Sequence, residues 1–212
     1  MAKPGRRSGA RAGDPSEAKR ERLIDAAFET LRDEGFAGAS ARAIAGRGGF
    51  NAALIFYYFH DLNDLLLHAL ASSSRTQLEK YEAALADVTT LPNLVASVQE
   101  RLRDDRDSGH IKVLAELVGA SSSDEHLRQA VIEQVKPWME FTGRTLDRIL
   151  GATGLAGLVP SGQVSFVVVS LFLGMELLGG VAGDDEVIDG LFGSAHQLST
   201  LLGSLLPAGA SS

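Results

Sequence analysis

The feature that most limits the fold of this 212-residue chain is the spacing of its apolar residues. Almost every segment repeats apolar side chains three or four residues apart, as in Leu23, Ile24, Ala27, Phe28 and Leu31, and this is the spacing of one face of an α-helix. The segments are separated by breaks rich in glycine, proline or serine, such as residues 151–162. We find no credible pair of β-strands and no internal repeat. The sequence therefore predicts an all-α protein of about nine helices.

Charge is distributed unevenly along the sequence. Residues 1–60 carry ten Lys and Arg against seven Asp and Glu, residues 61–212 carry ten against twenty, and the formal net charge is −7. A basic end on an acidic body is typical of a nucleic-acid-binding module attached to another domain. A basic tail beside an ordinary surface would give the same imbalance. Cysteine is absent, which excludes disulfides, thiolate metal sites and a cysteine nucleophile.

Residues 40–59 carry the most specific local pattern. They predict two short helices joined by a glycine-containing turn, with Ser40 as the first N-cap, which is the plan of a helix-turn-helix motif. In this motif a small core holds the second helix while its outer face enters the major groove of DNA. The four adjacent aromatics at 56–59 cannot all face inward, because each helical step rotates by about 100°. The expected core is Ile44, Ala45, Phe50, Ile55 and Phe59, and the expected outer face is Asn51, Ala52, Leu54, Tyr57 and Tyr58.

Residues 17–66 resemble the DNA-binding domain of the tetracycline-repressor (TetR) family of bacterial regulators. The resemblance lies in segments 22–28 (RLIDAAF), 34–36 (EGF), 40–45, 49–51 (GFN) and 56–59 (FYYF) and in the leucines at 65 and 66, in this order and spacing. It implies a homodimeric, ligand-responsive regulator, usually a repressor. We divide the chain into a disordered basic arm (1–15), a helix-turn-helix DNA-binding domain (16–62) and a helical ligand-binding and dimerisation domain (63–212).

The family's DNA contacts can be transferred to matching positions in this chain. Side chains at the helix-turn-helix and the first helix would contact phosphates and base edges of a double-stranded operator. Arg42 as a solvated surface residue and Tyr58 as a core residue are the alternatives. The phosphate contacts are expected from Ser40, Arg42, Tyr57 and Tyr58, the groove contacts from Asn51, Ala52 and Leu54, and further backbone contacts from Lys19 and Arg20.

Three departures from the family pattern concern DNA binding. Phe56 stands where the family commonly has Tyr, Leu62 where it commonly has Lys, and Ala52 and Ala53 where it often has Lys or a hydroxyl residue. Each lost phosphate contact weakens DNA binding and lowers its salt dependence. We hypothesise that the arginine-rich arm compensates for these losses.

The last two predicted helices carry heptad-like apolar stripes. The first of them is apolar nearly all round, which is typical of a helix buried on all sides. Two such helices at the end of the chain predict half of a four-helix bundle formed across a two-fold axis. A core within one subunit is the alternative. The expected dimer residues are Val168, Leu171, Met175, Leu191, Ala195, Leu198, Leu202 and Leu205.

An apolar cavity with a few polar groups is the usual site for a small molecule. The C-terminal helices supply candidate aromatic residues, and two acids lie within otherwise apolar stretches. Each aromatic could equally belong to a plain core. The candidates for an unknown small-molecule effector are Glu116, Trp138, Phe141, Thr142, Phe166, Phe172 and Glu176.

Other kinds of site are missing from the sequence. It contains no P-loop, dinucleotide-binding or nucleophile-elbow motif, and its five histidines lack paired ligand spacing. We therefore expect no enzyme, cofactor or metal. The apolar stretch 149–175 is interrupted by Pro160 and ended by Glu176, so we expect no membrane span and a cytoplasmic location. The predicted function is a homodimeric transcriptional regulator, most simply a repressor that a small molecule releases from a pseudo-palindromic operator. The alternative is a helical ligand-binding or interaction protein with weakened or lost DNA binding.

Overall fold

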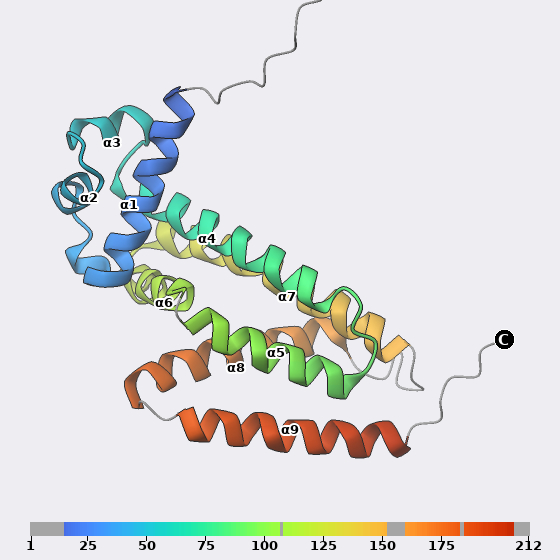
Figure 1. The fold of residues 1–212 in the computed structure, drawn as a ribbon. Coiled ribbons are helices and arrows are strands. Elements are labelled where there is room, and N and C mark those ends of the chain that lie inside the picture. The colour runs from blue at the N-terminus through green and yellow to red at the C-terminus, as the bar shows by residue number, and fades with distance from the viewer. Residues whose placement is uncertain (1–14, 107, 152–159, 183–184, 206–212) are drawn as a thin grey trace, which may run out of the picture.

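The computed structural model describes residues 15–106, 108–151, 160–182 and 185–205. These residues form nine α-helices and one short 3₁₀ turn, with no β-strand among them (Figure 1). The prediction of an all-α fold of about nine helices is confirmed. The helices are α1 (Pro15–Gly38), α2 (Ala41–Gly48), α3 (Ala53–Tyr58), α4 (Leu62–Leu85), α5 (Leu91–Arg106), α6 (His110–Ala120), α7 (Glu125–Gly151), α8 (Ser161–Ala182) and α9 (Asp185–Leu205).

Local capping sets the boundaries of the short N-terminal helices. The Ser40 hydroxyl accepts a hydrogen bond from the Ala43 amide at 3.2 Å and starts α2. Gly49, in the left-handed conformation at φ 70°, ends α2. Asp61 accepts from the Asp64 amide at 2.8 Å and starts α4. These caps hold α2 and α3 as two short helices at an angle, as a helix-turn-helix requires.

Gly35 changes the course of α1 rather than ending it. Glycine in the left-handed region commonly ends a helix, and the backbone does leave the helical region at Gly35, at φ 71° and ψ 178°. The chain then makes one more turn as far as Gly38. A left-handed φ favours glycine, because an L side chain there would clash with its own backbone.

One hydrophobic core joins the N-terminal helices to the rest of the molecule. Leu23 and Leu31 of α1, Leu66 of α4 and Val113 and Leu117 of α6 are fully buried in a single cluster. The N-terminal domain is therefore seated on α4 and α6, as Figure 1 shows. The division of the chain at residues 62 and 63 stays a prediction.

The remaining helices form the C-terminal body. α7 runs beside α4 and packs on α8, and α9 packs mainly on α5 (Figure 1). Pro137 lies inside α7, which continues past it to Gly151. Two smaller buried clusters form between these helices, one around Tyr81 and Phe141 and one around Leu102 and Phe192.

Candidate nucleic-acid interface and ligand cavity

The aromatic run of α3 divides between core and surface. Ile55 and Phe59 are buried, whereas Phe56 is 58% exposed and Tyr57 is 78% exposed. Tyr58 is half-buried, and its hydroxyl lies 3.1 Å from the Ser16 hydroxyl of α1. The expectation that some of the four aromatics must be exposed is confirmed. The ring of Tyr57 lies edge-on to the Tyr58 ring, with the centroids 4.9 Å apart, and most of its side chain is exposed to solvent.

Two residues expected on the groove face have partners in the protein. Leu54 is half-buried and packs against the core of the N-terminal domain, so it does not project fully outward as expected. Asn51 is exposed, and its Oδ1 accepts a hydrogen bond from the Ala53 amide at 2.9 Å. Asn51 thus satisfies a free N–H at the start of α3. Ala52, the next residue, is half-buried.

The candidate phosphate contacts are of two kinds. Arg42 at the start of α2 and Lys19 on α1 are exposed. Arg20 is half-buried; its guanidinium lies over the Phe59 ring, 5.2 Å from the centroid, and 3.7 Å from the Glu17 carboxylate. Lys19 and Arg42 are therefore exposed cations of this region, whereas the Arg20 side chain contacts other residues of the protein.

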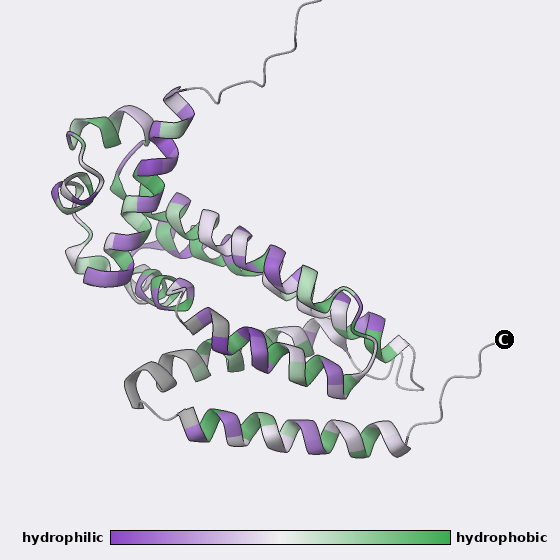
Figure 2. Ribbon diagram, in the orientation of Figure 1, coloured by the Kyte–Doolittle hydropathy of each residue, from purple (hydrophilic) through white to green (hydrophobic). Residues whose placement is uncertain are grey.

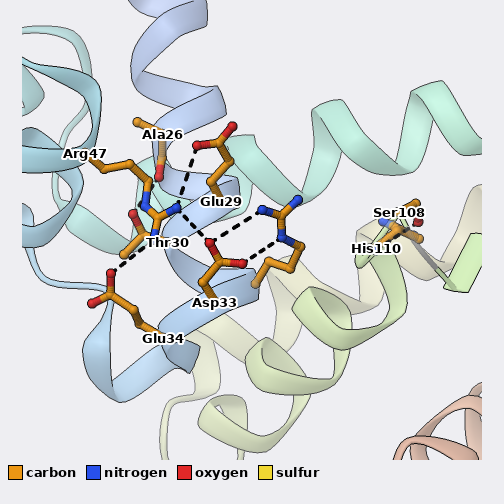
Figure 3. Close-up of polar contacts among 9 residues, drawn as sticks. Ala26, Glu29, Thr30, Asp33, Glu34, Arg47, Ser108 and His110 are labelled. Atoms are coloured by element: carbon orange, nitrogen blue, oxygen red, sulfur yellow. Dashed lines mark hydrogen bonds and ion pairs between the residues drawn. The ribbon is translucent and has the colours of Figure 1, made fainter.

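Arg47, on the last turn of α2, links α2 to α1 through three acidic side chains (Figure 3). Its guanidinium donates to Asp33 at 2.7 Å and to Glu34 at 3.2 Å, and it lies 3.8 Å from Glu29. Arg32 donates to the same Asp33 carboxylate at 2.8 Å. The hydrogen bond from Arg32, together with that from Arg47, lowers the pKa of Asp33. The sequence offered no sign of this cluster, because its members come from two helices.

A cavity of about 190 Å³ lies in the C-terminal body, bordered by α4 to α8. The structure brings four of the seven predicted ligand residues to its wall: Trp138, Phe141, Thr142 and Phe172. Phe166 does not line it and is 59% exposed. The side chain of Glu176 lies outside the described residues. Sequence reasoning missed Tyr81 of α4 and His110 and Leu114 of α6, which also line the cavity.

The polar side chains of Trp138 and His110 at the cavity wall contact other residues of the protein. Trp138 donates from Nε1 to the Ser74 hydroxyl at 2.8 Å. The His110 ring stacks on the Trp138 ring, with the centroids 6.0 Å apart, and its Nδ1 lies 3.1 Å from the Ser73 hydroxyl. Burial lowers the pKa of His110 to about 4. The imidazole is therefore neutral at pH 7.

Glu116 lies at the contact between α6 and α1, not at the cavity. Its Oε2 accepts a hydrogen bond from the Phe36 amide at 2.8 Å, directly after the kink at Gly35. A Cβ on Gly35 would come within 2.9 Å of the same oxygen. α6 thus contacts the N-terminal domain through Glu116 and the cavity through His110, Ile111 and Leu114.

Five of the eight predicted dimer residues are exposed apolar side chains on α8 and α9. Figure 2 shows hydrophobic residues recurring along α9. Val168 also lines the cavity, Met175 is half-buried against the Leu102 cluster, and Ala195 is half-buried. The side chain of Leu205 lies outside the described residues. The exposed members are Val168 (42%), Leu171 (53%), Leu191 (44%), Leu198 (59%) and Leu202 (39%).

The described part of the chain offers neither a membrane-spanning helix nor a metal site. Its helices include none with the length and hydropathy needed to cross a bilayer. It also contains no group of three or more His, Asp or Glu side chains placed to hold a metal ion.

Comparison with known proteins supports the resemblance noted in the sequence. Residues 23–69 match the sequence model of the family described as bacterial regulatory proteins, tetR family. This segment contains the helix-turn-helix described above. Residues 23–69 are therefore similar to the DNA-binding segment of the TetR regulators.

The curated proteins that this chain resembles are HTH-type transcriptional regulators. One from Mycobacterium tuberculosis, described as uncharacterised, is 28% identical over 110 residues, which are 52% of this chain and 56% of the relative. The regulator BetI of Cronobacter sakazakii is 30% identical over 130 residues, which are 61% of this chain and 54% of the relative. The matches thus span only about half the length of these curated relatives.

Solved structures share the fold over most of this chain. A TetR-family regulator from Cytophaga hutchinsonii superposes with a TM-score of 0.73 at 15% identity and covers 90% of this chain and 97% of its own. FadR of Bacillus subtilis, in complex with stearoyl-CoA, has a TM-score of 0.68 at 17% identity and covers 84% of this chain and 96% of its own. These likenesses extend the fold to the C-terminal helices.

The structure shows the environment of two residues that depart from the TetR pattern, Phe56 and Leu62. Phe56 is exposed and adds an apolar ring without a hydroxyl to the outer face of α3. Leu62 is half-buried and packs on the core. The basic arm proposed to compensate, residues 1–15, lies outside the described residues except for Pro15.

Proposed function

We propose that the protein is a homodimeric, ligand-responsive transcriptional regulator that binds a pseudo-palindromic DNA operator through α2 and α3. The observation that carries this proposal is the exposed face of α3. Tyr57 is 78% exposed at the end of a short helix whose other side is anchored by buried Ile55 and Phe59. A rigid short helix with an exposed outer face is what insertion into a major groove requires.

Charges beside α3 support contact with the DNA backbone. Lys19 of α1 and Arg42 of α2 are exposed, and Ser40 is exposed at the start of α2. Cations and hydroxyls at these positions would bind phosphates on both sides of the groove and fix the register of the helix. Asn51 and Ala52, at the start of α3, would lie closest to the base edges.

Dimerisation through α8 and α9 would place two such motifs on one operator. Val168, Leu171, Leu198 and Leu202 expose large apolar side chains on these two helices. An exposed apolar surface of this kind is typical of an interface between subunits. Substitution of Leu198 by Glu should leave monomers in a light-scattering measurement at micromolar concentration. Substitution of Gln197 by Glu, which adds a charge at the neighbouring exposed position, should leave the dimer intact.

The connection from the cavity to α3 suggests how a ligand would act. α6 supplies wall residues to the cavity and holds the kink of α1 through Glu116, while α4 runs from the cavity residue Tyr81 to the core beneath the helix-turn-helix. A ligand that binds better when these two helices are displaced would shift the population toward that arrangement. The distance between the two α3 helices of the dimer would change with it. A ligand with equal affinity for both arrangements would have no effect.

The decisive experiment is a DNA-binding titration with the region upstream of the protein's own gene. Fluorescence anisotropy at two salt concentrations gives the affinity and its salt dependence. Arg42→Ala should weaken binding and lower the salt slope by about one for each phosphate contact removed. Arg75→Ala, an exposed arginine on the middle of α4, is the matched control and should leave both values unchanged.

The alternative function predicts a different outcome of the same titration. The lack of a hydroxyl on exposed Phe56 and the packing of Leu62 on the core leave fewer phosphate contacts than the TetR pattern provides. If low salt reveals no sequence-specific binding and Arg42→Ala changes nothing, the protein is a helical ligand-binding or interaction protein that has lost its operator.

A further inference from the structure

The cavity in the C-terminal body is small for a ligand site. Its volume of about 190 Å³ is below the roughly 300–1,000 Å³ of sites that hold drug-sized ligands. An apolar protein cavity of about 150 Å³ is known to accept benzene. A single ring with one short substituent therefore fills this space, whereas two joined rings exceed it.

The wall of the cavity favours aromatic contacts. Tyr81 presents its ring edge-on to Trp138 and to Phe172, with centroids 5.4 Å and 6.3 Å apart. The His110 ring also stacks on the Trp138 ring. Rings at these spacings accept a further ring edge-to-face or offset-stacked, at a gain beyond that of apolar burial alone.

Charge on the wall selects against ions. The described residues that line the cavity include no lysine or arginine, so an anionic ligand finds no counter-ion. The acidic residue on the wall, Asp105, is buried and takes part in an interaction within the protein. Burial of an unpaired charge is strongly unfavourable. Hydroxyls of Thr142 and Thr145 are the groups available to a neutral polar substituent.

We propose that this cavity binds an uncharged compound built on a single aromatic ring, with at most a short neutral polar substituent such as a hydroxymethyl group. The inference builds on the proposed function, because it names the class of effector that would act at that site. It excludes carboxylates, amines and long acyl thioesters as ligands of the cavity in the observed arrangement.

Three matched probes test the charge preference. Benzyl alcohol, benzoate and benzylammonium share one ring and differ in the charge of the substituent. Trp138, the protein's sole tryptophan, lies on the wall, so its emission reports occupancy directly, and calorimetry gives the affinity. Benzyl alcohol should bind with a Kd of about 1 mM or lower and at least about tenfold more tightly than either ion. Biphenyl-4-methanol, the same alcohol with a second ring, should bind more weakly than benzyl alcohol.

Two variants place the binding in the cavity. Thr142→Phe places an added ring in the cavity and should abolish the change in Trp138 emission that benzyl alcohol causes. Thr76→Phe makes the same change at an exposed position of α4 and should bind the probe as the wild type does. Circular dichroism of both variants shows whether they are folded. Should Thr142→Phe unfold, xenon or toluene competition against benzyl alcohol in the wild type replaces it.

The outcomes separate this inference from the proposed function. Equal or tighter binding of an ion or of biphenyl-4-methanol, or no binding of benzyl alcohol, overturns the inference, even if the protein binds its operator. Selective binding of benzyl alcohol supports the inference. If operator affinity does not change when benzyl alcohol binds, only the ligand response within the proposed function is wrong.

Discussion

Removal of the Glu116 carboxylate tests the contact between α6 and the N-terminal domain. In Glu116→Leu the Phe36 amide loses its acceptor at the kink of α1, where the Gly35 backbone is non-helical. Hydrogen bonds to charged groups contribute about 1.5–3 kcal/mol, and because Glu116 is half-buried we take the lower limit, about 1.5 kcal/mol. For a chain of this size that is a fall in Tm of about 3–6 °C.

A local measurement distinguishes this contact from a general loss of stability. Hydrogen exchange at the Phe36 amide should become about tenfold faster in Glu116→Leu, which is the equivalent of 1.5 kcal/mol, approximately, in local opening. Glu116→Gln keeps an acceptor oxygen and should change exchange and Tm by less than half as much. Glu140→Leu, which removes an exposed acid on α7, is the control. Wild-type exchange at Phe36 in Glu116→Leu would refute the role assigned to this hydrogen bond.

Two further predictions concern titration and electrostatics. Burial lowers the pKa of His110 from 6.5 to about 4, so the histidine is protonated in the unfolded chain at a higher pH than in the folded protein. The stability contributed by neutral His110 is therefore full above pH 6.5 and is lost progressively as the pH falls toward 4. Denaturant unfolding should show a loss of about 2 kcal/mol between pH 7 and pH 5 that is absent in His110→Gln. Arg47→Ala should weaken DNA binding without lowering its salt slope, because Arg47 pairs with acids of α1 and positions α2; a lower slope would instead place Arg47 on a phosphate.

Features set by neighbours in the sequence were predictable. Helical periodicity predicted the helices, and the predicted N-cap Ser40 accepts a hydrogen bond from the amide three residues away. The division of the aromatic run into buried and exposed members followed from helical rotation alone. Local geometry suffices for such features, since every atom involved belongs to the same turn of chain.

Features set by distant partners were not predictable. Glu116 meets Phe36 across 80 residues of sequence, and nothing near either residue indicates the other. Phe166 was expected at the cavity and is exposed. This prediction failed because the sequence of a helix that is apolar nearly all round does not show which face points inward. Leu54 was expected on the surface and packs on the core. This prediction failed because a helix as short as α3 has too few turns for its sequence to define a buried and an exposed face.

The uneven charge of the sequence overstates the basic surface available to DNA. Of the six described cations in residues 15–60, Arg22 donates to the Gly48 carbonyl, Arg32 and Arg47 pair with acids of α1, and Arg20 packs on Phe59. Lys19 and Arg42 remain exposed without such contacts in the described part of the chain. Two phosphate contacts per subunit, doubled in a dimer, give a salt slope of about −4.

A measured slope therefore tells whether the N-terminal arm takes part. Its cations are Lys3, Arg6, Arg7 and Arg11. If the arm binds phosphates, the full chain should show a slope well steeper than about −4, and deletion of residues 1–14 should return it to that value. A full-length slope already near −4 that deletion leaves unchanged would show that the arm does not replace the contacts missing at Phe56 and Leu62. Operator affinity would then come from α2, α3 and the start of α1 alone.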